Sequence, residues 1–433
     1  MNKTNIYKIY LAVFYAFCFS LLLIKFPPFN ISQFVSKLST THVLAKFMLL
    51  FISVTLVIID GKNVLSRLKQ APFLPLLSVY FLCGSISVFE ANDISFFIQQ
   101  YQNVVFGIIM FILAYLFVIK IDTKKIITFI IIVGLLSLLS DVLFILFSSS
   151  LLILLEEYIQ KEMYALYSFN LNENKYNLYL STEIFLPFFL FYIATYWKKR
   201  WYIFSIISTV LMGFIALFSN FRTRLIQFVF VSMTSIYYLR STFKKSIIPL
   251  LVLILIGASL SFMVIRSNTS FDILDRFILS DEKDVNTILY RFDTFSYASS
   301  ILQAKPLFGV GLGNYKFYIN QRKNAGIRDE ASRLHTNETN DNPHSVFIQI
   351  ITETGVIGFI SFIALLFYFL KNDIGLMKNQ IDSKNSFLFS CIIASWTLFL
   401  YGVFNPFNTI FLNGWFWYFR GTIEGIRILN SKS

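Results

Sequence analysis

The chain has 433 residues, of which 56% are hydrophobic and 14% are charged, and its formal net charge is +13. Apolar runs long enough to cross a bilayer recur along the whole chain, so the composition excludes a soluble protein and indicates a polytopic membrane protein. Nucleic acid is not an expected partner, because Lys and Arg cluster in short runs between apolar segments, as topology signals do.

The apolar runs predict about twelve transmembrane helices of roughly 20 residues each. No small-residue cleavage site follows the first run, so we expect a membrane helix there and not a cleaved signal peptide. The predicted spans lie near residues 9–26, 42–60, 72–89, 102–120, 126–148, 178–197, 201–219, 225–240, 246–265, 345–370, 386–403 and 409–427. Cys18, Cys83 and Cys391 all fall inside these runs, where buried packing is expected and neither disulfides nor a thiolate metal site.

Basic residues in every second connector predict that both termini are cytoplasmic. The signal comes from Lys3 and Lys8, from Lys62, Arg67 and Lys69, from Lys120, Lys124 and Lys125, from Lys198, Lys199 and Arg200, from Arg240, Lys244 and Lys245, from Lys371, Lys378 and Lys384, and from Arg420, Arg427 and Lys432 in the tail. The other face then carries connector 149–177 and a large extracytoplasmic loop, 266–344, between spans 9 and 10. Within that loop, Asn286–Gln303 has the apolar spacing of a helix. We predict an all-α membrane bundle in which residues 1–433 form a single domain.

Two arginines stand in a very short turn, Phe218–Arg224, that this topology puts on the extracytoplasmic face. Positive charge is scarce on that side, so Arg222 and Arg224 indicate a bound anion such as a diphosphate, which guanidinium groups contact in a bidentate way. The alternative is a pair of arginines that snorkel at the membrane interface. Arg291, within the large loop, is by itself equally well explained as a surface residue paired with Asp293.

Three glycines at alternate positions follow Pro306 in the same loop: Gly309, Gly311 and Gly313. Their spacing is not the dinucleotide-binding fingerprint, and no strand–turn–helix unit surrounds them. We therefore expect a tight turn whose backbone packs closely against its neighbours.

His344 is one of three histidines and follows Pro343 at the start of the tenth predicted span. A neutral imidazole there can take a proton from an attacking hydroxyl at neutral pH. No second histidine or cysteine pair stands at metal-ligand spacing, so a metal site is not expected. Glu353 lies nine residues further on, on the opposite side of a regular helix, where a hydrogen-bonded packing role beside Gly355 is the preferred interpretation.

Three features therefore follow in one order: an arginine-bearing turn, a large loop with the pattern P-x-F-G-x-G-x-G, and a P-H-S helix start followed by E-x-G-x-x-G. Over roughly residues 215–360 this resembles the superfamily of O-antigen polymerases and O-antigen ligases. The chain departs from the family pattern at Phe221, where a serine often precedes the arginine, and at Ser345, where asparagine commonly follows the histidine.

The resemblance implies a GT-C-like helical bundle and a donor that is a sugar chain on undecaprenyl diphosphate. It implies metal-independent transfer, with inversion at the anomeric carbon and no cofactor. Carried over to this chain, it gives diphosphate binding to Arg222 and Arg291, an assisting role to Arg224, and activation of the acceptor hydroxyl to His344.

The resemblance further implies a bacterial inner-membrane protein whose active site faces the periplasm, with membrane lipids and a chain-length regulator as possible partners. We favour a polymerase that joins lipid-linked repeat units. The alternative is a ligase that transfers the chain to the lipid A core, because both reactions use the same donor and the same arginine and histidine residues. A transporter of the same lipid-linked sugar is a second alternative. The two halves of the chain lack the hydropathy symmetry that a transporter would show, which counts against it.

Overall fold

The structure, a computed structural model, describes residues 3–25, 40–69, 71–139, 169–170, 175–176, 182–193, 207–213, 215–216, 222–239, 294–324, 343, 345–377, 386–404 and 410–432. The regular elements among them are helical except for a ribbon of two antiparallel strands, β1 (Phe169–Asn170) and β2 (Lys175–Tyr176). The all-helical class predicted from the sequence is therefore confirmed.

The helices follow one another along the chain as α1 (Lys3–Lys25), α2 (Thr40–Lys69), α3 (Leu74–Ile86), the 3-10 helix η1 (Ser87–Glu90), α4 (Ile94–Lys120), residues 123–139, η2 (Thr182–Phe185), α7 (Leu186–Phe188), η3 (Phe189–Ile193), residues 207–213, α10 (Arg222–Leu239), residues 294–304, α14 (Tyr315–Asn324), α15 (Val346–Met377), α16 (Ser386–Phe404) and α17 (Ile410–Lys432).

Four of these helices are long and apolar enough to cross a membrane: Leu44–Lys69 within α2, α4, α15 and α16. The prediction of a multi-pass membrane protein is thus supported, whereas the number of twelve spans stays a prediction. Predicted span 246–265 lies outside the described residues, as does most of loop 266–344. The predicted helix Asn286–Gln303 is observed in part, as residues 294–304.

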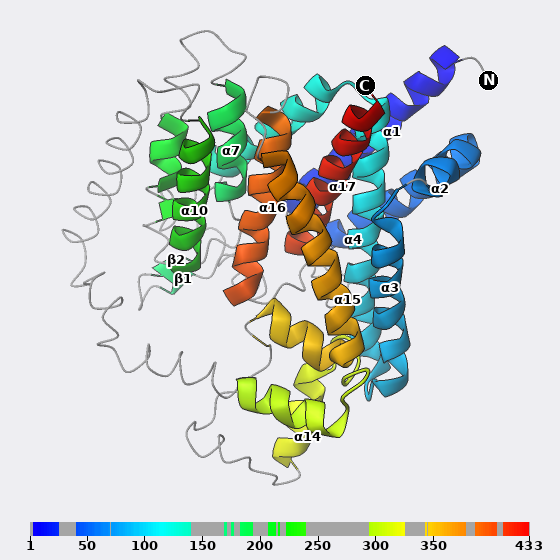
Figure 1. The fold of residues 1–433 in the computed structure, drawn as a ribbon, viewed down its shortest axis with the longest axis vertical. Coiled ribbons are helices and arrows are strands. Elements are labelled where there is room, and N and C mark those ends of the chain that lie inside the picture. The colour runs from blue at the N-terminus through cyan, green and yellow to red at the C-terminus, as the bar shows by residue number, and fades with distance from the viewer. Residues whose placement is uncertain are drawn as a thin grey trace, which may run out of the picture.

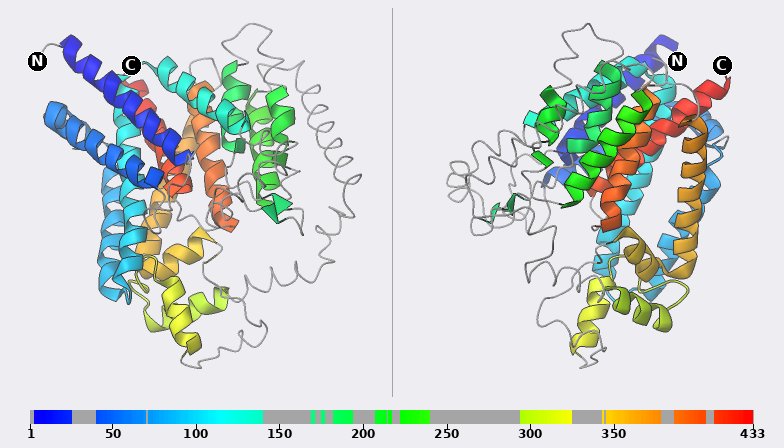
Figure 2. Two further views of the ribbon diagram at one scale, coloured as in Figure 1. Left: turned by 180° about the vertical axis from the view of Figure 1, so that it is seen from behind. Right: turned by 60° about the vertical axis from the view of Figure 1, so that its left-hand side comes forward.

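The helices form a bundle with both chain termini at one end and α14 at the other (Figure 1). Further views show the same arrangement, with residues 294–324 at the end away from the termini (Figure 2). The N-terminal end of α4 and the start of α15 both lie at this second end, which we call the loop end of the bundle.

At the centre of the bundle, α4 and α17 pack closely because α17 presents glycines to α4. A Cβ at Gly414 would lie 2.5 Å from Met110 Sδ, and one at Gly421 would overlap the backbone carbonyl of Phe111. Gly425, one turn after Gly421, lies close to the Tyr115 carbonyl in the same way. This small-xxx-small spacing lets membrane helices approach each other closely.

Candidate active site

The loop end is organised by the segment Pro306–Asn314, which we call the glycine turn. Gly309, Gly311 and Gly313 have φ angles of 67°, 87° and 73°. Side chains other than glycine rarely adopt these values. A Cβ at Gly311 would lie 2.7 Å from Ala91 Cβ, and one at Gly313 would lie 2.6 Å from the Phe96 carbonyl oxygen. The predicted tight turn with close backbone packing is confirmed.

Helix α15 is broken where the glycine turn meets it. Gly355 has φ 67° and ψ −170°, a combination that is essentially restricted to glycine. Four backbone hydrogen bonds join the two segments: the N–H groups of Val310 and Gly311 donate to the carbonyls of Thr352 and Glu353 at 2.9 and 3.0 Å, and the N–H groups of Val356 and Ile357 donate to the carbonyls of Pro306 and Leu307 at 2.9 and 3.4 Å.

The glycine turn is also attached to the start of α4. Asn314 Oδ1 accepts the Asp93 backbone N–H at 2.8 Å, and Asn314 Nδ2 donates to the Asp93 carbonyl at 3.0 Å. Just before the turn, Lys305 Nζ donates to the Glu90 carbonyl at 2.9 Å and pairs with Glu90 Oε2 at 3.0 Å. The turn is thereby held between α4 and α15.

Asp93 has a second role as the N-cap of α4. Its carboxylate accepts hydrogen bonds from the backbone N–H groups of Ser95 and Phe96, at 2.8 and 3.3 Å, and from the Ser95 hydroxyl at 2.7 Å. The Ser95 hydroxyl, followed by these backbone groups, lowers the pKa of the Asp93 carboxyl, because each bond favours the charged form.

Glu353 is buried, with 3% of its surface exposed, in the part of α15 that precedes the break. Its carboxylate accepts a hydrogen bond from Gln349 Nε2 at 3.4 Å and one from the backbone N–H of Gly313. The hydrogen-bonded packing role predicted for Glu353 is confirmed. Its partner in the glycine turn, 40 residues earlier in the chain, is a contact that the sequence did not indicate.

The proposed catalytic and diphosphate-binding residues are only partly described. His344 lies outside the described residues, between Pro343, which is buried, and Ser345, which is half-buried. Arg291 also lies outside them. Arg222 is the first residue of α10, and its side chain is not among the described ones.

Arg224 is buried and pairs with a carboxylate that the sequence motifs did not single out. Its Nε and Nη2 atoms lie 2.9 and 2.8 Å from Glu183 Oε1, and 2% and 1% of the two side chains are exposed. Glu183 belongs to η2, inside predicted span 178–197. A carboxylate within an apolar span needs a partner, and that signal could have pointed to Glu183.

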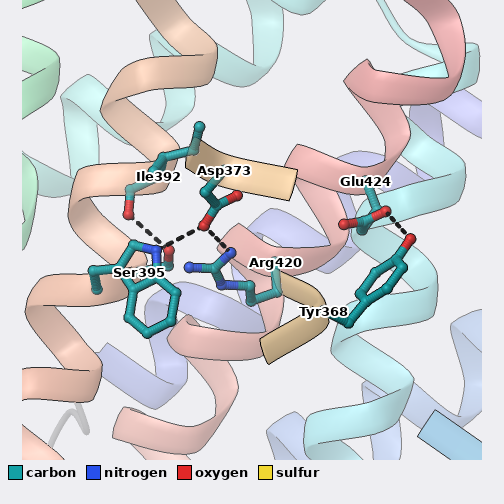
Figure 3. Close-up of polar contacts among 7 residues, drawn as sticks. Tyr368, Asp373, Ile392, Ser395, Arg420 and Glu424 are labelled. Atoms are coloured by element: carbon teal, nitrogen blue, oxygen red, sulfur yellow. Dashed lines mark hydrogen bonds and ion pairs between the residues drawn. The ribbon is translucent and has the colours of Figure 1, made fainter. Parts of the chain in front are cut away.

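A second buried charged group joins α15, α16 and α17 (Figure 3). Asp373 Oδ2 accepts from Arg420 Nη1 and from Trp396 Nε1, at 2.6 Å in both cases. The Arg420 guanidinium lies over the rings of Trp396 and Phe369, 4.6 and 5.0 Å from their centroids. Arg420, which was counted among the basic residues that indicate topology, is fully buried within α17.

One turn further along α17, Glu424 pairs with Arg427 at 2.7 Å. The hydroxyl of Tyr368 on α15 donates to Glu424 Oε2 at 3.4 Å (Figure 3). Arg427 Nη2 donates to the same hydroxyl. These contacts connect α17 to the part of α15 that follows Gly355. They support the packing of these two helices.

Comparison with known proteins gives a family match to part of the chain. A protein-family model described as O-antigen ligase matches residues 207–363, which include α10, the glycine turn and the break in α15. A search of curated proteins finds no match. The family match confirms, over this part of the chain, the resemblance to the O-antigen polymerase and ligase superfamily predicted from the sequence.

Proposed function

We propose that the protein is an O-antigen polymerase, or a polymerase of a related surface polysaccharide, which joins oligosaccharide repeat units carried on undecaprenyl diphosphate. The observation that supports this class of reaction is the family match over residues 207–363, which contains Arg222, Arg291 and His344 together. The choice of a polymerase over a ligase follows the interpretation favoured from the sequence. The reaction takes place on the periplasmic face of the bacterial inner membrane, and the energy comes from the glycosyl–diphosphate bond of the donor.

In the proposed reaction, a hydroxyl oxygen of the acceptor sugar attacks the anomeric carbon of the donor from the side opposite the diphosphate. The bond between that carbon and the diphosphate oxygen breaks, which inverts the configuration. His344 takes the proton of the attacking hydroxyl. Arg222 and Arg291 stabilise the negative charge that develops on the departing lipid diphosphate.

Arg224 receives a different role in this proposal. Its Nε and Nη2 atoms both contact one Glu183 oxygen, and the ion pair is buried. A guanidinium that is already neutralised is poorly suited to hold a diphosphate. We assign to Arg224 the task of fixing the first turn of α10, so that Arg222, two residues earlier, is presented to the donor.

A ligase that transfers the finished chain to the lipid A core remains the alternative function. It would use the same donor and the same arginine and histidine residues. A chain-length regulator is a proposed protein partner only for the polymerase.

The experiment is a lipopolysaccharide gel from the native host, comparing the gene deletion with the deletion restored by the wild-type gene. A collapse of the ladder to core plus a single repeat unit in the deletion strain supports the polymerase, since ligation still works. Complete loss of O-antigen from the core, with long chains left on the carrier lipid, contradicts the polymerase and supports the ligase.

A further inference from the structure

The break at Gly355 takes four backbone groups of α15 away from their usual partners. In a continuous α-helix, the Val356 N–H would donate to the Thr352 carbonyl, and the Ile357 N–H would donate to the Glu353 carbonyl. In the structure, all four groups bond instead to the glycine turn.

The glycine turn supplies a new hydrogen-bond partner for each of the four backbone groups. The carbonyls of Pro306 and Leu307 take the two freed N–H groups, and the N–H groups of Val310 and Gly311 take the two freed carbonyls. Two donors and two acceptors on each side are thus satisfied reciprocally. Thr352 and Glu353 are buried, and an unpaired backbone group in a buried or membrane setting is costly, so the break and the turn depend on each other.

The fit between the two segments leaves no room for side chains. A Cβ at Gly355 would overlap the Leu307 carbonyl, and a Cβ at Gly309 would overlap the Thr352 carbonyl. The Gly313 N–H adds a bond to the Glu353 carboxylate from the far end of the turn. The Glu353 carboxylate therefore holds the C-terminal part of the turn, which the four backbone hydrogen bonds do not contact.

We propose that the glycine turn is inserted into α15 as a structural part of that helix, and that it sets the direction of residues 346–354 and with it the position of Ser345, the residue before α15. Gly355 and Glu353 are then positioning residues for the chemistry proposed at this end of α15. The catalytic consequence, correct placement of His344, rests on the proposed function, whereas the geometry itself does not.

Removal of the turn has a defined structural result. Without it, α15 can satisfy the four groups only by forming the two missing helical bonds, which straightens the helix and redirects residues 346–354. Alanine at position 355 strains the broken form and favours the helical form, because alanine is the best helix former. Gly355→Ala therefore favours the straight helix on both counts.

The first experiment measures geometry. Ser345→Cys is introduced into the full-length protein in membranes and labelled with a membrane-impermeant maleimide, in a background where the three native cysteines are replaced by alanine. Gly355→Ala is expected to change the labelling rate several-fold. Gly375→Ala is the matched control, since a Cβ at this other α15 glycine meets nothing within 4 Å. Equal labelling rates in the Gly355→Ala and wild-type backgrounds would overturn the proposal.

The second experiment measures positioning in catalysis, using purified protein and a lipid-linked donor. Glu353→Ala is expected to lower kcat by about 100-fold with little change in KM for the donor, the size of effect that a misplacement of about 1 Å produces. Glu353→Gln is expected to restore most of the kcat, because its amide oxygen can still accept the Gly313 N–H. Equal kcat losses for the two variants would contradict the bracing role.

The inserted turn and the proposed catalytic mechanism can fail separately. An altered labelling rate together with a fully active His344→Ala variant would keep the inserted turn and reject the proposed mechanism. An unaltered labelling rate together with an inactive His344→Ala variant would reject the inserted turn and keep the proposed mechanism.

Discussion

Asp373→Asn is expected to destabilise the bundle strongly. The Asp373 carboxylate pairs directly with the Arg420 guanidinium, and 2% and 1% of these two side chains are exposed. The substitution keeps the shape of the side chain and removes its charge, which leaves the buried Arg420 cation without its directly bonded carboxylate. Removing one partner of a buried ion pair costs about 3–5 kcal/mol.

The magnitude converts into a measurable shift of the melting temperature. An unfolding entropy of ~2.1 cal/mol/K per residue gives ~0.9 kcal/mol/K for 433 residues, so the expected fall in Tm is about 3–5 °C. The assay is thermal unfolding of purified protein in detergent, followed by intrinsic tryptophan fluorescence. Arg420→Met and the double variant complete a cycle, in which the double variant should be more stable than Asp373→Asn alone, because no charge is left unpaired.

Two results would refute this reasoning. A Tm for Asp373→Asn within about 1 °C of wild type would mean that the ion pair contributes little to the stability of the bundle. A double variant whose loss equals the sum of the two single losses would mean that the two side chains act independently.

Three further predictions concern helix packing, α10 and α4. Gly421→Ala forces a Cβ into a backbone carbonyl of α4 and should lower stability by about 1–3 kcal/mol, whereas Gly375→Ala, which meets open space, should not; comparison of their Tm values tests this. Arg224→Met should remove the guanidinium that pairs with the buried Glu183 carboxylate and lower the amount of folded protein in membranes, as measured by gel filtration in detergent. Normal levels would contradict a stabilising role of the ion pair. Asp93→Ala should lower Tm at neutral pH and not in acid. Folding lowers the pKa of the Asp93 carboxyl, so its contribution to stability is present at neutral pH and is lost as pH falls through that pKa. A Tm difference that persists in acid would argue against the capping role.

Hydropathy located several helices well, because a long apolar segment satisfies its backbone best as a helix. Predicted span 386–403 corresponds to α16, and predicted span 345–370 corresponds to the first 25 residues of α15, Val346–Leu370. Predicted span 178–197 was expected to be regular, but its described part passes from a 3-10 helix through a short α-helix into a π-helix. Hydropathy reports length and burial, and it does not report such breaks.

The break at Gly355 could not have been read from the sequence. A glycine permits positive φ without requiring it, and the break here depends on partners in the glycine turn, more than 40 residues away. The pairs Arg224–Glu183 and Asp373–Arg420 are 41 and 47 residues apart. Its position in the sequence placed Arg420 among the topology signals, and its burial could not be predicted because its partner Asp373 is near it only in three dimensions.

The measurement that tests the central claim most directly is polymerisation by the purified protein in nanodiscs, supplied with repeat units on undecaprenyl diphosphate. Three proteins are compared: wild type, His344→Ala, and His335→Ala, which removes another histidine of the same loop. We predict a ladder of lengthened chains from wild type and His335→Ala, without added metal or nucleotide, and none from His344→Ala. A full ladder from His344→Ala would contradict the proposed mechanism.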